Sequence, residues 1–60
     1  MNSNLQLYLS LLSNLHSSKQ QAIELLDKTN DEAIRDSLNL IEASIKDLTT
    51  SRTAKELIGK

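Results

Sequence analysis

Apolar residues recur along this chain with alternating spacings of three and four residues, in two separate stretches. The first stretch, whose one charged member is Lys19, comprises Leu5, Tyr8, Leu12, Leu15, Lys19, Ala22 and Leu26, with Leu9 and Ile23 beside it. The second comprises Ile34, Leu38, Ile41, Ile45 and Leu48. This spacing places each set on one face of an α-helix, as in a helical bundle or coiled coil. The pattern predicts an all-α fold with two long amphipathic helices.

A polar segment at residues 28–31 separates the two stretches and predicts a turn. Thr29 and Glu32 have the spacing of a capping box, in which Thr29 caps the second helix and Glu32 reaches back to it. Asn30 is the competing cap, because asparagine also accepts hydrogen bonds from the first turn of a helix. We expect a single domain, 1–60, with helix one at about 4–28 and helix two at about 30–50.

The two chain ends carry weaker signals. Residues 2–4 are Asn-Ser-Asn, which are suitable N-caps for the first helix. Residues 49–53 are poor helix formers but contain no stop signal, and helical composition resumes at Ala54. Gly59 is a plausible C-cap. We therefore expect the second helix to continue as a softer extension to about residue 58.

The composition limits how such a chain can be stabilised. It has 60 residues, no cysteine and a single histidine, His16, so disulfides are excluded and a zinc site lacks ligands. A chain this short buries only about 60% of its unfolded surface, and small folds then rely on oligomerisation. We expect an antiparallel two-helix hairpin that dimerises into a four-helix bundle.

The first helix has more leucines than one contact line uses. Leu7, Leu11 and Leu25 lie on a second line, which is polar at Asn14, Ser18 and Gln21. We predict an interface at residues Leu5, Leu7, Tyr8, Leu9, Leu11, Leu12 and Leu15, in which Leu7, Leu9 and Leu11 contact a second chain. The alternative is that these leucines are scattered surface residues, which are normal on soluble proteins.

Candidate chemistry is sparse. His16 is the only candidate base or pH switch, and nothing in the sequence specifies a nucleophile beside it. The acidic turn lacks the alternating oxygen ligands and central glycine of a calcium loop. We expect no enzymatic activity, no metal and no cofactor.

Charge restricts the partners further. The net charge is −1, which gives no overall support for nucleic-acid or acidic-membrane binding. The apolar segment 5–15 is too short to span a bilayer and has no basic flank. We therefore expect a cytoplasmic interaction module that binds itself or another helical protein. The alternative is a dimeric nucleic-acid regulator that places Lys46, Arg52 and Lys55 on phosphates.

Three segments of the chain carry a family resemblance: Leu9-Ser10-Leu11-Leu12, Thr29-Asn30-Asp31-Glu32-Ala33 and Ile45-Lys46-Asp47-Leu48. With them the chain resembles a family of small helical-hairpin proteins of endospore-forming bacteria. The resemblance covers about two thirds of the chain. After Leu48 the chain lacks the acidic tail that is typical of the family. It implies a spore-associated helical protein without known catalysis, and it transfers no functional residues.

Overall fold

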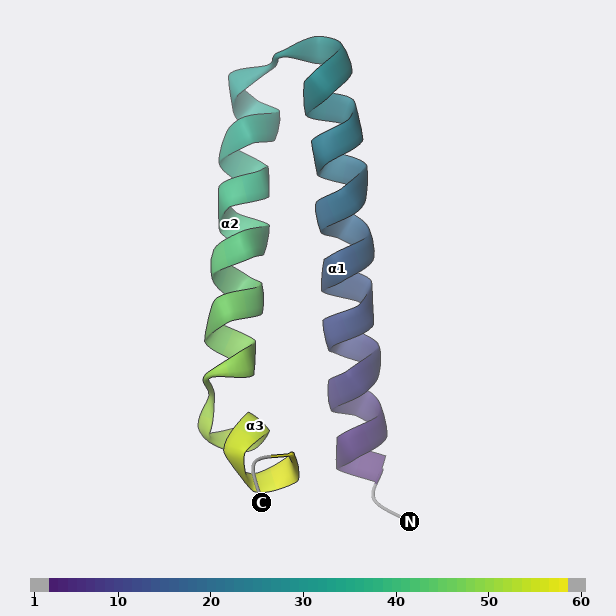
Figure 1. Cartoon of the computed structure of the whole chain (residues 1–60), viewed down its shortest axis with the longest axis vertical. Coiled ribbons are helices and arrows are strands. Elements are labelled where there is room, and N and C mark those ends of the chain that lie inside the picture. The colour runs from purple at the N-terminus through teal and green to yellow at the C-terminus, as the bar shows by residue number, and fades with distance from the viewer. Residues whose placement is uncertain (1–2, 59–60) are drawn as a thin grey trace.

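The computed structural model describes residues 3–58, and within that range the chain is helical without any strand. The helices are α1 (Ser3–Thr29), α2 (Glu32–Thr49) and α3 (Arg52–Leu57). The two long helices, α1 and α2, lie side by side and run in opposite directions (Figure 1). The predicted all-α class is confirmed, whereas the number of helices is three rather than two. The expected caps at Asn2 and Gly59 lie outside the described residues.

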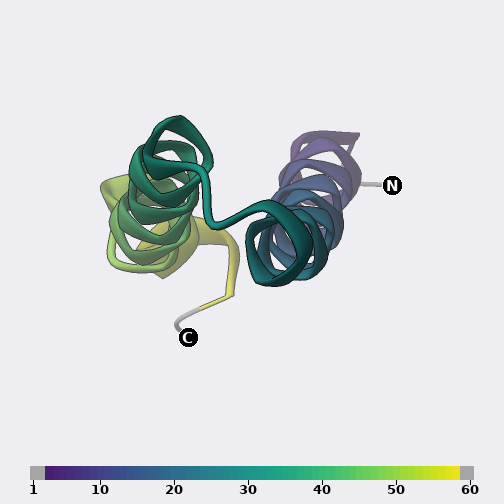
Figure 2. The ribbon, with the colours of Figure 1, turned by 90° about the horizontal axis from the view of Figure 1, so that it is seen from above.

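The contact between α1 and α2 uses the residues that the three-four spacing predicts. Tyr8 is buried, and the other predicted positions of both helices are partly buried, Lys19 included. Every other described residue of α1 and α2 is exposed. Leu9 and Ile23, which we expected to widen the stripe, remain 47% and 40% exposed. The two helices therefore share one narrow, mostly apolar seam. Figure 2 shows the two helices side by side, seen from above.

The connection between α1 and α2 differs from the predicted capping box. Thr29 is the last residue of α1, and its hydroxyl donates to the Leu25 carbonyl at 2.8 Å. Asn30 then takes a left-handed conformation, with φ at 53°, and its amide donates to the Leu26 carbonyl. Asparagine tolerates this conformation better than most residues, and it ends helices in this way.

The N-cap of α2 is Asp31, not Thr29 or Asn30. Asp31 has an extended backbone, and its carboxylate accepts a hydrogen bond from the Ala33 amide at 2.9 Å. The Thr29 hydroxyl accepts from the Asp31 amide at 3.3 Å, but Thr29 is still part of α1, and Asn30 is in the left-handed region. Asp31 is therefore the first polar residue with the extended backbone of an N-cap. Asp31 and Glu32 also place negative charge at the positive end of the α2 dipole.

The expected continuation of the second helix is interrupted at Thr50 and Ser51. The hydroxyls of Thr49 and Thr50 donate to the carbonyls of Ile45 and Lys46, at 3.0 and 2.9 Å. Such side-chain bonds compete with helix continuation, and three consecutive hydroxyl residues concentrate them here. Ser51 turns to an extended backbone and caps α3 by accepting from the Ala54 amide at 3.1 Å. The stop signal is thus a run of hydroxyls rather than a glycine or proline.

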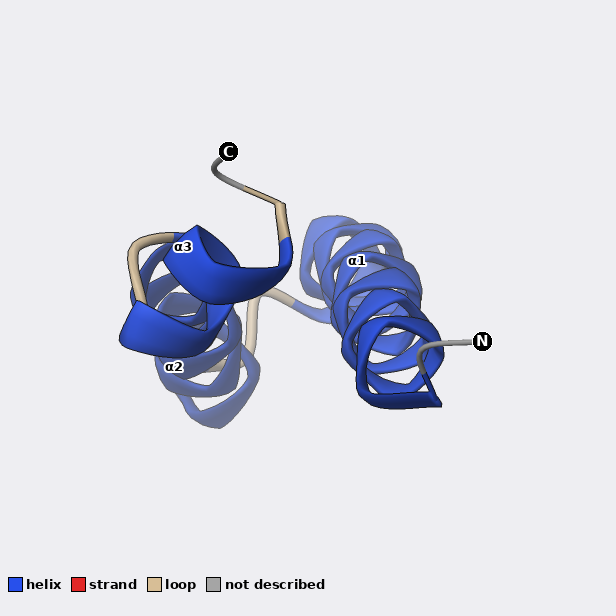
Figure 3. Ribbon diagram, turned by 90° about the horizontal axis from the view of Figure 1, so that it is seen from below, coloured by secondary structure: helices blue, strands red, loops and turns tan. Residues whose placement is uncertain are grey.

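The short helix α3 folds back against the lower end of the seam. Figure 3 shows α3 lying across the end of α2, with one end of α3 directed towards α1. Ala54 is buried there, and the Tyr8 hydroxyl donates to the Leu48 carbonyl at 3.3 Å. The Ser51 hydroxyl donates to the same Leu48 carbonyl at 2.7 Å. One carbonyl therefore joins α1, the end of α2 and the start of α3.

The molecule is long and has little interior. Its axes measure 43 × 18 × 13 Å, and its radius of gyration is 13.7 Å, against about 10.4 Å for a compact domain of this length. Its accessible surface is 4765 Å² for 6.7 kDa, against about 3900 Å² for a compact monomer of that mass. Tyr8 and Ala54 are the only buried apolar residues of the described chain. The fold therefore exposes roughly 850 Å² more than its mass requires.

Candidate interaction surface

The first half of α1 is uncharged. From Ser3 to Ser18 the helix contains no lysine, arginine, aspartate or glutamate, and the first charged side chain is that of Lys19. Leucine, serine, asparagine and glutamine make up most of this segment. Uncharged side chains cost less to remove from water than charged ones, so this part of the surface suits contact with another protein.

The seven predicted interface residues divide into two groups. Leu5, Tyr8, Leu12 and Leu15 belong to the seam with α2, where Tyr8 is buried and the others are partly buried. Leu7, Leu9 and Leu11 are exposed, at 69%, 47% and 49%. The structure thus places the first group in the contact between α1 and α2 and leaves the second group exposed.

The three exposed leucines do not form one patch. An α-helix turns by about 100° per residue, so Leu9 points about 160° away from both Leu7 and Leu11. Leu7 and Leu11 are only about 40° apart. Leu11 faces a shallow groove shared with Ser44 and Asp47 of α2, whereas Leu9 lies on the opposite side of α1. A flat partner can therefore cover Leu7 and Leu11 together, or Leu9, but not all three.

Leu7 and Leu11 begin a longer exposed line on α1. We name it the outer line, and it consists of Leu7, Leu11, Asn14, Ser18, Gln21 and Leu25. All six residues are exposed, and Leu25 at the far end is 49% exposed. Because 18 residues make about five turns, Leu25 lies directly above Leu7 on the helix surface. The outer line therefore runs almost the whole length of α1.

Two exposed leucines fall outside the N-terminal cluster that the sequence singled out. Leu25 is on the outer line, and Leu40 is on α2 with 69% of its surface exposed. The spacing of Leu25 from Leu11 is two heptads, which is the signal that links it to the same line. Leu40 has only the small residues Ala33 and Ala43 near it at helical spacing, so it does not continue a line of exposed leucines.

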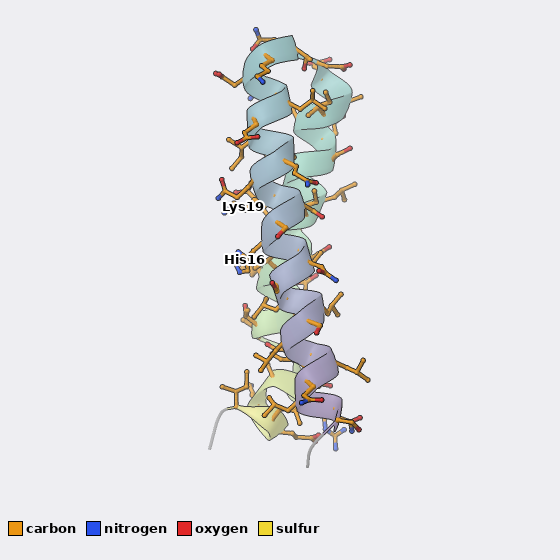
Figure 4. All side chains as sticks on the ribbon, turned by 90° about the vertical axis from the view of Figure 1, so that its right-hand side faces the viewer. His16 and Lys19 are labelled. Carbon is orange, nitrogen blue, oxygen red and sulfur yellow. The ribbon has the colours of Figure 1, made fainter. Side chains whose placement is uncertain are left out.

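The other side of α1 is polar at mid-length. His16 and Lys19 project to the same side of the helix (Figure 4). The Lys19 Nζ lies 3.7 Å from Glu42 Oε2, which ties α1 to α2 on this side. His16 is exposed and lies about half a turn away from Leu7, because nine residues make about two and a half turns. His16 is therefore remote from the outer line.

Shallow depressions occur on both sides of the seam. One, of about 300 Å³, lies between Tyr8, Leu12, Thr49 and α3. Another, near the turn, is lined by Ile23, Asp27, Arg35 and their neighbours. Within residues 3–58 no group of three or more potential metal ligands is clustered. Nor does any helix in that range have the length and apolar character needed to cross a bilayer.

The basic residues of the predicted nucleic-acid contact are distributed over two elements. Lys46 is on α2, and Arg52 and Lys55 are on α3. The Arg52 Nε donates to Glu56 Oε1 at 3.2 Å, in an ion pair whose two side chains are largely exposed. A phosphate would have to compete with this contact.

Comparisons with protein-family models, with curated proteins and with solved structures give no match for this chain. The resemblance to the helical-hairpin proteins of endospore-forming bacteria stays a prediction.

Proposed function

We propose that this protein is a non-enzymatic interaction module, a helical hairpin that pairs with another helical surface through the leucines of α1. The simplest closed form is a homodimer that makes a four-helix bundle. A second helical protein that covers the same leucines is the other partner class that we expect.

The main support for this proposal is the large accessible surface of the folded chain. The fold exposes roughly 850 Å² more than a compact monomer of its mass, and a standard protein interface takes about 800 Å² from each partner. The seam alone leaves large apolar residues in water, among them Leu7, Leu11 and Leu25. Removing each from water on association contributes up to ~1.5–3 kcal/mol. Below about 70–80 residues a single core rarely supplies more than 3–5 kcal/mol. Association therefore adds stability comparable to that of the core.

The test is the molar mass in solution, followed across a dilution series together with helicity. We expect the mass of a dimer at micromolar concentration, and a melting temperature that falls on dilution, because folding and association are linked. A monomer that stays fully helical with the same melting temperature down to nanomolar concentration would exclude the proposal.

A matched pair of variants separates the leucine surface from a general effect of charge. Leu11→Asp should give a monomer at the concentration where the parent is a dimer, with part of its helicity retained. Ser13→Asp introduces the same charge at an exposed site two residues further on, on the other side of α1. We expect Ser13→Asp to keep the parent mass, and monomers in both variants would contradict a leucine-specific contact.

A further inference from the structure

The outer line is symmetric about residue 16. Position 7 is as far from it as position 25, position 11 as far as position 21, and position 14 as far as position 18. Leucines lie at both ends, at Leu7 and Leu25, and the uncharged polar residues Asn14 and Ser18 lie at the centre. When a helix surface with this property meets an inverted copy of itself, leucine faces leucine at both ends and polar residues face polar residues at the centre. Such self-complementarity is what a two-fold symmetric contact requires.

We propose that the occupant of the outer line is a second copy of this chain, with α1 packed antiparallel against α1 of that copy. The two-fold axis crosses α1 at the level of residue 16, on the side away from the His16 side chain. This inference rests on the proposed function and specifies its partner, its face and its direction.

The antiparallel register pairs each exposed leucine with an uncharged residue. Leu7 meets Leu25 of the second copy at both ends of the contact, about 27 Å apart at 1.5 Å per residue. Leu11 packs on the aliphatic part of Gln21 of the second copy. Asn14 and Ser18 meet their counterparts near the axis, where an amide and a hydroxyl can exchange hydrogen bonds. A central polar layer between apolar ends is a known means of fixing the register of paired helices.

Charge favours the antiparallel direction over the parallel one. The end of the molecule around the turn is acidic, because residues 20–36 carry five carboxylates against Lys28 and Arg35. A parallel pair would bring two such ends together, and like charges repel. An antiparallel pair places each acidic end beside the opposite end of the other copy, where Lys46, Arg52 and Lys55 outnumber Asp47 and Glu56. The outer line itself carries no charge to bury.

Disulfide trapping tests this geometry, because the chain has no cysteine of its own. Leu7→Cys and Leu25→Cys are mixed in equal amounts in a glutathione redox buffer, with one variant labelled with ¹⁵N so that mixed disulfides differ in mass. A disulfide needs Cα atoms within about 7 Å of each other. We expect the mixed disulfide to exceed each homodisulfide at least tenfold.

The matched control is the pair Leu9→Cys and Ile23→Cys. These positions are also equidistant from residue 16 and have similar exposure, at 47% and 40%, but they lie on the opposite side of α1. We expect little cross-linking between them. Asn14→Cys with Ser18→Cys is a second test pair that removes no leucine, and circular dichroism checks that each variant is helical.

Each outcome has a distinct meaning. Mixed disulfides at 7 with 25, or at 14 with 18, support the proposal. A predominant homodisulfide at position 7 indicates a parallel pair, and preferential trapping at 9 with 23 indicates the other face; either result overturns it. A parent dimer in which neither test pair cross-links overturns the inference but leaves the proposed function intact. A monomeric parent rejects both.

Discussion

The ring and the hydroxyl of Tyr8 make separable contributions to stability, which two substitutions can measure. The side chain is 6% exposed and lies where α1, α2 and α3 meet. Tyr8→Phe removes only the hydrogen bond to the Leu48 carbonyl, which is 3.3 Å long. Tyr8→Ala removes the ring as well and leaves a cavity beneath α3.

The structure sets the expected magnitudes. After Tyr8→Phe the Leu48 carbonyl still accepts from the Ser51 hydroxyl, so no buried group is left without a partner and the loss should be about 0.5–1 kcal/mol. For 60 residues the unfolding entropy is about 0.13 kcal/mol/K, so the melting temperature should fall by about 4–8 °C. Tyr8→Ala should cost about 3–5 kcal/mol, by analogy with other large aromatic deletions. That is as much as a core of this size supplies in total, so this variant should be largely unfolded.

Thermal melts by circular dichroism measure both effects, at one fixed protein concentration because association shifts the melting temperature. Equal destabilisation by Tyr8→Phe and Tyr8→Ala would mean that the hydroxyl, not the ring, dominates. Unchanged melting of Tyr8→Ala would mean that the junction with α3 does not form in solution, and the reasoning from burial would be refuted.

Three further substitutions address the turn, the bend and the seam. Asn30→Ala should lower the free energy of unfolding by about 1 kcal/mol, whereas Asn30→Gly should change it little, because only a residue without Cβ adopts a positive φ freely. Equal urea midpoints for the two variants would show that the left-handed turn is absent. Ser51→Ala should remove about 1 kcal/mol of capping from α3, seen as loss of helical ¹³Cα shifts over residues 52–57, and unchanged shifts would contradict the cap. Lys19→Leu should raise the urea midpoint, because the half-exposed ion pair with Glu42 contributes at most about 1 kcal/mol and a leucine packs better in the seam. A lower midpoint would show that the ion pair contributes more than about 1 kcal/mol.

The seam was predictable from sequence because it depends on one quantity, the spacing of apolar residues. A heptad pattern fixes which side of each helix is covered, and Leu12, Lys19 and Ile41 are partly buried as that pattern requires. Helix geometry also predicts that Leu7 and Leu11 lie on one side of α1 and Leu9 on the other. The sequence-based interface nevertheless grouped them by proximity along the chain.

The junctions were not predictable in the same way. Thr29, Asn30 and Asp31 are all suitable cap residues by type, and the choice depends on where α1 ends and which of them has an extended backbone. Likewise, the hydroxyls of Thr49 to Ser51 bond the last carbonyls of α2 at the point where the chain folds back to bury Tyr8 and Ala54. Helix propensity alone does not predict that tertiary contact.

The shared Leu48 carbonyl links distant parts of the chain in one opening event. It accepts hydrogen bonds from Tyr8, 40 residues away, and from Ser51, which starts α3. Undocking of α3 would therefore loosen the first turns of α1 as well, although the two segments are far apart in sequence. Native-state hydrogen exchange should show the amides of both segments opening as a single cooperative unit, separate from the half of the molecule near Asn30.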